Sequence, residues 1–325
     1  KMAEAGYRVY IGGKIGIFNL LKNKKVKEGI FFYKSAFSQS TNQTLKLIKK
    51  CDHAVVLDEE MGLAMGNVEA ALQYRIVNLK YISKFFVIGK NLQKKIQNSI
   101  KFGKNKIIAS GWPKYDLCKQ KYSQYYFDQA KKIKKKYGNF YLFASNFGIL
   151  NKKTLNERLN NKFNKKKYNK KNIKTINEIA VNAYSDYKGF IKNINRFSKV
   201  NQLKIIVRPH PGDISIDDWY NDIKQNDNIK LIYDGDIAPW ILASEGLIHR
   251  GCGTSIEAML FKKKLIYFLP NRKVNNYEKN IPFKISQKIN SLDTNKIKIL
   301  KKNNLKVKNI LKNNISNNDN IYSYN

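Results

Sequence analysis

The sequence predicts an α/β protein with two domains, each built on a parallel sheet that carries helices on both faces. Short apolar runs of strand length alternate with amphipathic stretches of helix length, which is typical of βαβ units. A basic stretch at residues 119–138 interrupts this alternation, and the pattern restarts after it. The length of 325 residues also suits two ordinary domains. We therefore expect an N-terminal domain over residues 1–137 and a C-terminal domain over residues 138–325.

Each domain is predicted from its own series of elements. Helices are expected at residues 41–50 in the first domain and at 178–198, 238–244 and 254–261 in the second, and a further helix after residue 291 is expected to pack on the body. The apolar runs that predict strands lie within residues 7–13, 29–35, 53–60, 84–90 and 105–116, and then within 139–148, 203–213, 229–235, 245–253 and 263–270, the last being the final strand.

The charge of the chain restricts its partners. The sequence holds 62 Lys and Arg against 24 Asp and Glu, a formal net charge of +38, which attracts nucleic acid, anionic lipid headgroups or phosphorylated substrates. Because lysines are mixed with asparagines, as at residues 161–174, we interpret most of them as a solvated surface and expect no specific nucleic-acid partner.

Composition also bears on location and on metals. No stretch reaches the roughly 18 apolar residues of a membrane helix. The three cysteines lack the spacing of a disulfide framework or a zinc site. We expect a cytoplasmic protein, peripheral at an anionic inner membrane face, and no metal site.

Polar residues that follow the predicted strands are the candidate site residues, because ligands of open parallel sheets bind beyond the carboxyl ends of the strands. His210 lies between Pro209 and Pro211, which place the imidazole on a stiff loop. It can donate to a phosphate or to a departing nucleotide; the alternative is a histidine that only caps the strand edge. Other strand ends supply Arg208, which assists with the anion or is an ordinary surface arginine, and Asp58, Glu59, Glu60, Ser110 and Gly111.

Residues 247–261, LIHRGCGTSIEAMLF, predict a strand, a glycine-rich turn and a helix. Backbone N–H groups of such a turn can converge on an anion, and Thr254 or Ser255 can cap the helix. Glu257 can accept both hydroxyls of a ribose, or it is an ordinary first-turn acid that gains from the helix dipole. His249 and Arg250, before the turn, can complete a diphosphate or carboxylate clamp.

These motifs resemble a known family. RPHPGD at residues 208–213, followed by LIHRGCGTSIEAMLFKKKLIYF at 247–268, is similar to the donor-binding half of GT-B glycosyltransferases, in particular bacterial surface carbohydrate biosynthesis proteins. The similarity extends more distantly to capsule Kdo transferases and CDP-glycerol glycerophosphotransferases. It implies two Rossmann-like domains that face a cleft, the first on the acceptor side and lacking its first strand, the second binding the donor. The supporting matches are VLDEEMG at 56–62, FFVIGK at 85–90, IIASGWPKYDL at 107–117 and FASNFG at 143–148.

The resemblance implies a metal-independent transferase that needs no cofactor. It would move a sugar from a nucleotide-activated donor, with a cytidine nucleotide as one option, to a surface glycan or lipid-linked acceptor. His210 would contact the leaving phosphate, Glu257 would bind the sugar of the nucleotide, and one of three acids would take the acceptor proton; a solvated acidic turn is the alternative for those acids. The implied residues are Asp58, Glu59 and Glu60 as acids, Asn146, Arg208, Pro211, His249, Arg250, Gly251, Gly253, Thr254 and Ser255 on the donor side, and Ser110 and Gly111 on the acceptor side.

Two other functions fit the same sequence. A sugar-nucleotide epimerase also has two facing α/β domains, and it would release free nucleotide without an acceptor. A basic protein that binds nucleic acid or an anionic polymer is the non-catalytic alternative. Its affinity should fall with salt and should not depend on His210.

Overall fold

The structure is a computed structural model that describes residues 2–23, 29–34, 51–58, 79–100, 103–119, 121–151, 170–200, 204–213, 216–270 and 280–292. Glu59, Glu60 and the helix expected at residues 41–50 lie outside these ranges. The chain divides into two compact units between Trp112 and Pro113, whereas the sequence-based division is at Gly138. The connection groups with the second unit because its helix α6 (Phe127–Tyr137) packs against α11 (Ile237–Ala243).

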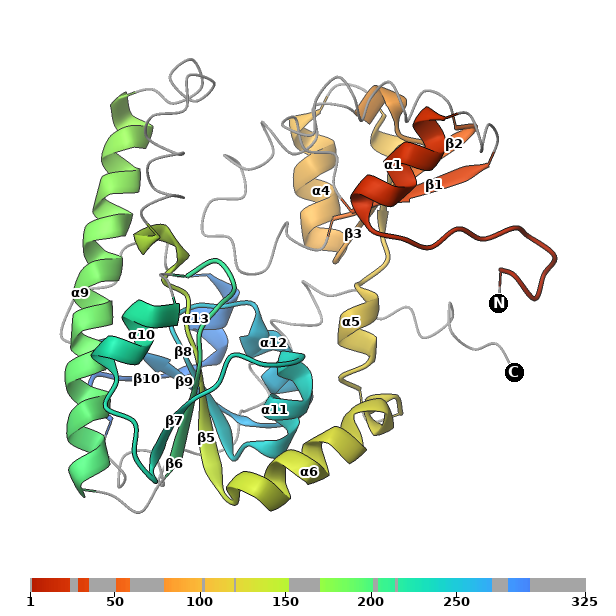
Figure 1. The fold of residues 1–325 in the computed structure, drawn as a ribbon. Coiled ribbons are helices and arrows are strands. Elements are labelled where there is room, and N and C mark those ends of the chain that lie inside the picture. Colours follow the sequence, from red (N-terminus) through yellow and green to blue (C-terminus); the bar gives the residue numbers. More distant parts are fainter. Residues whose placement is uncertain are drawn as a thin grey trace. The chain divides into compact units, whose positions relative to one another are not determined.

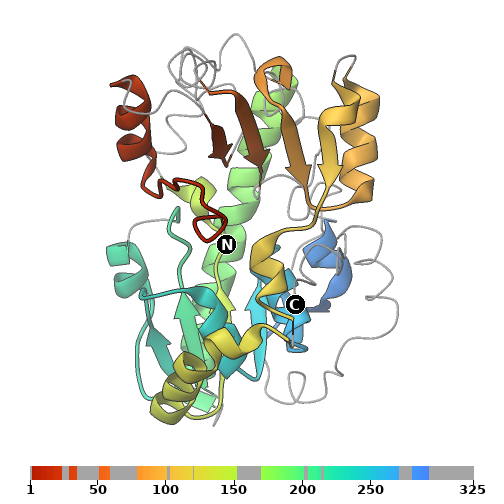
Figure 2. The ribbon, with the colours of Figure 1, turned by 90° about the vertical axis from the view of Figure 1, so that its right-hand side faces the viewer.

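The first unit contains a four-stranded parallel sheet in the order β1-β2-β3-β4, visible side by side in Figure 2. Val56 lies opposite Phe85 on the neighbouring strand, and neither side chain has any exposed surface. Leu92 and Ile96, four residues apart, form the buried face of α4. The elements are β1 (Ile30–Tyr33), β2 (His53–Leu57), β3 (Lys84–Val87), β4 (Ile107–Ala109), α1 (Lys14–Lys22) and α4 (Lys90–Ser99), with 3-10 turns at Leu79–Tyr81 and Lys104–Lys106.

The strand predicted at residues 7–13 does not form. These residues have no regular structure, they pair with none of the described strands, and Ile11 is 95% exposed. Alternating apolar residues stabilise a strand only where a neighbour supplies the ladder hydrogen bonds and a surface to cover. Periodicity alone gives a wrong prediction here.

The second unit contains a six-stranded parallel sheet in the order β10-β9-β8-β5-β6-β7. Figure 1 shows α9 and α10 on one face and α11, α12 and α6 on the other. All five residues of β5 are buried, as expected for a central strand covered on both faces. The strands are β5 (Phe140–Ala144), β6 (Lys204–Arg208), β7 (Ile229–Leu231), β8 (Gly246–His249), β9 (Lys264–Phe268) and β10 (Gln287–Ile289); the helices besides α6 and α11 are α5 (Pro113–Asp116), α9 (Lys170–Val200), α10 (Ile216–Asp222), α12 (Thr254–Leu260) and α13 (Ile281–Ile285).

The prediction that residues 263–270 form the last strand is wrong. They form β9, and β10 pairs with it in parallel. Two of the three residues of β10, Gln287 and Lys288, are polar, so the segment has no apolar run that periodicity could detect.

None of the helices within the described residues has the length and apolar content needed to span a bilayer.

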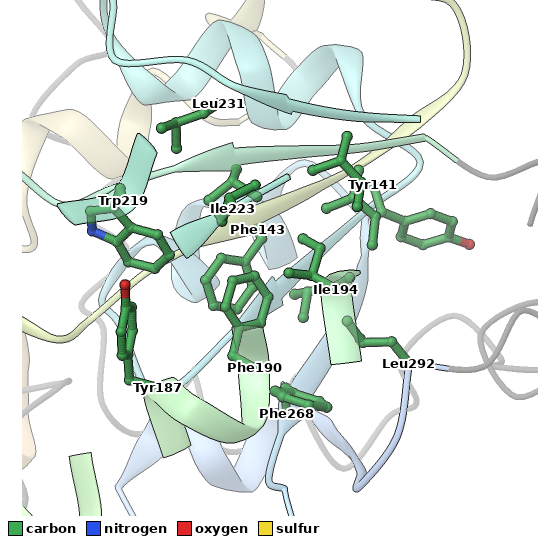
Figure 3. Close-up of a cluster of buried hydrophobic side chains, with 14 of the residues drawn as sticks. Tyr141, Phe143, Tyr187, Phe190, Ile194, Trp219, Ile223, Leu231, Phe268 and Leu292 are labelled. Carbon is green, nitrogen blue, oxygen red and sulfur yellow. The ribbon is translucent and has the colours of Figure 1, made fainter. Parts of the chain in front are cut away.

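An aromatic core fixes α9 on the sheet (Figure 3). Ala183, Tyr187, Phe190 and Ile194 recur at helical spacing and are all buried. Phe190 stacks on Phe143 of β5 with ring centroids 3.7 Å apart. Burying aromatic rings of this size contributes much of the stability of a core, and here it holds the long helix against the central strand.

The order of the strands creates a switch point. The chain runs outward from β5 to β6 and β7, and it then returns to place β8 on the opposite side of β5. The connections that leave β5 and β8 therefore diverge to opposite sides of the sheet. Open α/β sheets bind ligands at this kind of position, beyond the carboxyl ends of the strands.

Gly189 provides a test of how closely α9 approaches the sheet. A Cβ at this position would lie 2.5 Å from Cβ of Pro270, which follows β9. We expect Gly189→Ala to lower the free energy of unfolding by about 1–2 kcal/mol, because the overlap outweighs the gain in helix propensity. Urea unfolding followed by tryptophan fluorescence measures the change. Ser185→Ala, exposed on the same helix, should be neutral, and an equal effect of both variants would contradict the close contact.

Candidate functional site

Three neighbouring strands of the second unit deliver candidate residues to one edge of the sheet. Ala144, the last residue of β5, lies in register with Arg208 of β6 on one side and with His249 of β8 on the other. The residues that follow these positions therefore leave the sheet at the same level. The structure brings together Ser145 and Asn146, Pro209 and His210, and Arg250 and Gly251.

A buried carboxylate, that of Asp213, ties the loop after β6 to the loop after β5. Its Oδ1 accepts the backbone N–H of Phe147 at 2.7 Å. Its Oδ2 accepts the hydroxyl of Ser145 and, at 3.3 Å, the backbone N–H of His210. Burial raises the pKa of the Asp213 carboxyl, while these hydrogen bonds oppose the shift. Asp213 ends the RPHPGD motif, but the sequence analysis did not single it out, because its burial could not be seen from the motif.

His210 is exposed, and the hydrogen bond at one ring nitrogen defines its tautomer. Nδ1 accepts the backbone N–H of Gly212 at 3.0 Å. An accepting Nδ1 carries no proton, so the neutral imidazole has its proton on Nε2. Nε2–H has no partner within the described residues, and the side chain is exposed. His210 therefore presents an N–H donor at the surface of the second unit.

Gly148, on the loop after β5, allows that loop to pack against the backbone of the His210 loop. A Cβ at Gly148 would lie 2.7 Å from the carbonyl oxygen of Gly212. The turn Gly148–Leu150 thus packs directly on the backbone of the His210 loop. FASNFG and RPHPGD, far apart in the sequence, are two halves of one structure. The sequence analysis quoted Gly148 only as part of a motif and missed this contact.

His249 lies inside the unit, with both ring nitrogens bonded to protein groups. Nδ1 accepts the backbone N–H of Gly251 at 3.0 Å, and Nε2–H donates to the hydroxyl of Ser286 at 2.8 Å. That hydroxyl donates in turn to the carbonyl of Pro282 at 2.7 Å. Burial lowers the pKa of His249 to about 3. The clamp role predicted for His249 would require one of these nitrogens to be freed, and the present contacts make it a support for the glycine turn.

The glycine turn is shaped by Gly251 and ends in a helix that no side chain caps. Gly251 has φ +82, and a Cβ there would lie 3.2 Å from the Tyr267 hydroxyl. The N-cap of α12 is Gly253, without a side-chain hydrogen bond. The prediction that Thr254 or Ser255 caps this helix is wrong: the Ser255 hydroxyl donates to the carbonyl of Cys252, and the Thr254 hydroxyl lies 2.6 Å from its sulfur.

Glu257 occupies the first turn of α12, as predicted, and is 8% exposed. Burial first, and then the charge of Glu257, raise the pKa of the Cys118 thiol. Burial raises the pKa of Tyr126 to about 12, with Asp236 and Glu257 among the charges that add to it. Cys118 and Tyr126 are thus within range of the Glu257 charge, and α12 packs against α5.

Arg250 and Asn146 join the ends of β8 and β5 at the switch point. Asn146 Nδ2 donates to the Arg250 carbonyl, and Arg250 Nη1 donates to the Asn146 carbonyl, both at 3.5 Å. Arg250 Nε donates to Asp186 Oδ2 on α9 at 2.5 Å, and the two side chains are only 10% and 1% exposed. Asp186 is a further residue that the sequence analysis missed, since nothing in the helical pattern distinguishes a buried acid from an exposed one.

The Arg208 guanidinium is bonded to backbone carbonyls within the second unit. Its guanidinium donates to the carbonyls of Gly235 at 2.7 Å and Asp236 at 3.2 Å, and it lies 5.2 Å from the ring centroid of Trp240. Burial lowers its pKa. Arg208 therefore ties β6 to the loop before α11. Pro211, by contrast, is exposed in the turn after His210.

Three predicted residues of the first unit are described. Asp58 follows β2 and is 1% exposed, so the alternative of a solvated acid does not hold for it. The Ser110 hydroxyl donates to the carbonyl of Gly111 at 2.9 Å after β4, and Gly111 has φ +76. Their acceptor-side role stays a prediction.

Within the ranges that the structure describes, no group of three or more His, Cys, Asp or Glu side chains could hold a metal ion.

Comparison with known proteins establishes the fold. No protein-family model matches the chain, and no curated protein matches it. The UDP-GlcNAc 2-epimerase of Methanocaldococcus jannaschii, in complex with UDP-GlcNAc and UDP, is 15% identical over 93% of this chain and 75% of that chain, with a TM-score of 0.51. The chain has the GT-B fold. The predicted pair of Rossmann-like parallel-sheet domains is thereby confirmed.

More distant structures are also similar. The UDP-N-acetylglucosamine 2-epimerase of Rickettsia bellii is 11% identical over 91% of this chain and 68% of that chain, with a TM-score of 0.48. The pneumococcal O-GlcNAc transferase GtfA, in complex with UDP and GlcNAc, is 12% identical over 80% of this chain and 46% of that chain, with a TM-score of 0.41.

We expect Asp213→Asn to loosen the His210 loop. In either orientation the amide N–H group would meet a backbone donor, the Phe147 N–H or the His210 N–H, where a carboxylate oxygen now accepts. This mismatch should cost about 1–3 kcal/mol of unfolding free energy. Urea unfolding measures the loss, and hydrogen exchange at the His210 amide should accelerate. Asp218→Asn, an exposed acid on α10, is the matched control. Unchanged exchange in Asp213→Asn would contradict the anchoring role.

The buried His249 predicts a dependence of stability on pH. Its pKa is lower in the folded chain than in the unfolded chain, so the unfolded state takes up a proton first as the pH falls below about 6.5. The free energy of unfolding should therefore fall by about 1–2 kcal/mol between pH 6.5 and 5. His249→Asn should remove this part of the slope in urea titrations. His53→Asn, at an exposed histidine, should keep it; equal slopes for all three proteins would be inconsistent with a neutral buried imidazole.

Proposed function

We propose that the chain is an enzyme that binds a nucleotide-sugar at the carboxyl edge of the second unit's sheet. The observation that carries the proposal is the His210 imidazole, which is exposed, held by the Asp213 network and protonated on Nε2. It lies on the loop that follows β6, the strand next to the switch point, where open α/β sheets bind their ligands. A donor fixed in this way suits a phosphate oxygen.

A diphosphate is the ligand group that this edge would accept. His210 would donate Nε2–H to it, the backbone amides of the turn at Cys252 and Gly253 would add donors, and Arg250 would add positive charge. Glu257 would bind the ribose of the nucleotide. The amide of Gly251 would remain bonded to His249, so that His249 positions the turn without contacting the ligand.

Epimerisation of a sugar-nucleotide is the reaction we favour. The support is the structure with a TM-score of 0.51, a UDP-GlcNAc 2-epimerase in complex with UDP-GlcNAc and UDP, which is similar over 93% of this chain. The reaction would act on a UDP-sugar without an acceptor or a metal. His210 would stabilise the negative charge that develops on the departing diphosphate, which is commonly a large contribution to catalysis.

A glycosyltransferase of cell-surface polysaccharide biosynthesis is the second candidate. It is supported by the motif resemblance and by Asp58, a buried carboxyl at a strand end. In this case Asp58, Glu59 or Glu60 would take the proton of an attacking hydroxyl, and Ser110 and Gly111 would line the acceptor side. The acceptor would be a surface glycan or a lipid-linked sugar, and a cytidine nucleotide remains an option for the donor.

Incubation with UDP-GlcNAc alone distinguishes the two reactions. An epimerase should form the C2 epimer without an acceptor, as followed by proton NMR, whereas a transferase should consume the donor only with an acceptor. Thermal shifts with UDP, GDP, CDP and CMP identify the base, because a ligand that binds only the folded state raises the melting temperature. Absence of any shift with all four nucleotides would overturn the proposal.

His210→Ala tests the residue that carries the proposal. Losing one preorganised donor should lower turnover by about 10²–10³-fold and reduce the thermal shift given by the nucleotide. The matched control is His53→Ala, at an exposed histidine of the first unit, which should behave as wild type. Full activity of His210→Ala would remove His210 from the reaction.

A further inference from the structure

We propose that one face of α6, with the turn before it, binds an anionic lipid bilayer. This α6 face consists of Tyr125, Phe127, Lys131, Lys132, Lys135 and Lys136, all exposed. Figure 1 shows α6 beside α11 at the border of the second unit. The inference concerns where the protein is held and does not depend on the proposed reaction.

The packing of α6 decides which side faces outward. Tyr126 and Ala130 are buried, and the ring of Tyr137 lies 5.3 Å from that of Trp240 on α11. These positions fall on one side of the helix, at spacings of four and seven residues. Lys131, Lys132 and Lys135 therefore point away from α11, and Lys136 lies at the margin of the face, with Nζ 5.2 Å from the ring centroid of Tyr137. The four lysines form two rows at i and i+4, Lys131 with Lys135 and Lys132 with Lys136.

The charge of the α6 face is poorly neutralised. Asp128 is the one acid in the sequence of α6; it is exposed and lies three and four residues before Lys131 and Lys132, so it offsets one lysine charge of this face. Glu245, the acid that α6 meets on the loop before β8, is paired with Lys134 at 2.5 Å. The α6 face thus keeps a net positive charge, which is available to an anionic partner.

Aromatic rings beside these lysines distinguish a bilayer from other anions. Tyr125 is 70% exposed and Phe127 is 42% exposed. Aromatic side chains are favoured at the depth of lipid headgroups, where lysines meet the anionic lipids. Both rings lie at the start of a convex helix face. Single-stranded nucleic acid is instead bound in grooves where successive rings stack on successive bases, so the arrangement favours a lipid surface.

Helix α4 offers a matched control within the same chain. It too carries exposed lysines, Lys90, Lys94 and Lys95, and it has no acid to offset them, but no exposed aromatic residue belongs to it. A binding surface defined only by lysine content would include α4 as well as α6. A surface defined by lysines together with aromatic rings would include only α6.

Vesicle sedimentation of the full chain tests the proposal. We expect binding to phosphatidylcholine vesicles that contain about a third of phosphatidylglycerol, and not to pure phosphatidylcholine. Replacing the four lysines of the α6 face by Gln should weaken binding about tenfold or more. Tyr125→Ser with Phe127→Ser should weaken it severalfold with the lysines intact. The triple Gln variant of α4 should bind within about twofold of wild type.

Other outcomes would overturn the proposal. Equal losses in the α4 and α6 variants would mean that net charge attracts vesicles from any side. Unchanged vesicle binding in the α6 variants, with loss of binding to single-stranded RNA in a filter assay, would assign the surface to nucleic acid. Thermal unfolding of each variant shows whether the fold is kept, which is expected because all the altered side chains are exposed. Nucleotide thermal shifts should be the same in the α6 variants and in wild type.

Discussion

The candidate site depends on the burial of one carboxylate. A buried charge is tolerated only where hydrogen bonds replace the water that it has lost. Asp213 obtains these bonds from Ser145 and Phe147 on one loop and from His210 on another. The loops after β5 and β6 are therefore fixed to each other. The exposed imidazole takes its position from this network and its tautomer from the Gly212 N–H.

Other buried polar groups also hold the loops of the candidate site in place from inside the protein. His249 holds the backbone of Gly251, Asp186 holds Arg250, and Arg208 holds the loop at Gly235 and Asp236. Each uses its hydrogen-bonding groups inside the protein, at one end of the sheet. Hydrogen-bond donors on loops that are fixed in this way need little rearrangement when a charge develops beside them. Electrostatic stabilisation of such a charge requires this kind of preorganisation.

The surface is governed by a different constraint. A net charge of +38 places lysines on many faces, so charge alone cannot identify where a partner binds. The difference between α4 and α6 comes from what lies beside the lysines. Exposed rings at Tyr125 and Phe127 give α6 an apolar contribution that α4 lacks.

The sequence by itself determined the alternation of strands and helices, and with it the parallel sheets, the strand ends that His210 and Arg250 follow and the helix start that carries Glu257. These features follow from local periodicity and from turn residues, which act over a few positions. Strand pairing is not local, so residues 7–13 were predicted as a strand without a neighbour to pair with, and the short polar β10 was missed. Only the tertiary structure decided which polar residues are buried as supports and which are exposed at the end of the sheet. His249 and His210 both lie at or just after the end of a strand, yet one is buried and the other exposed, because burial depends on contacts with distant segments such as Ser286, which is bonded to His249.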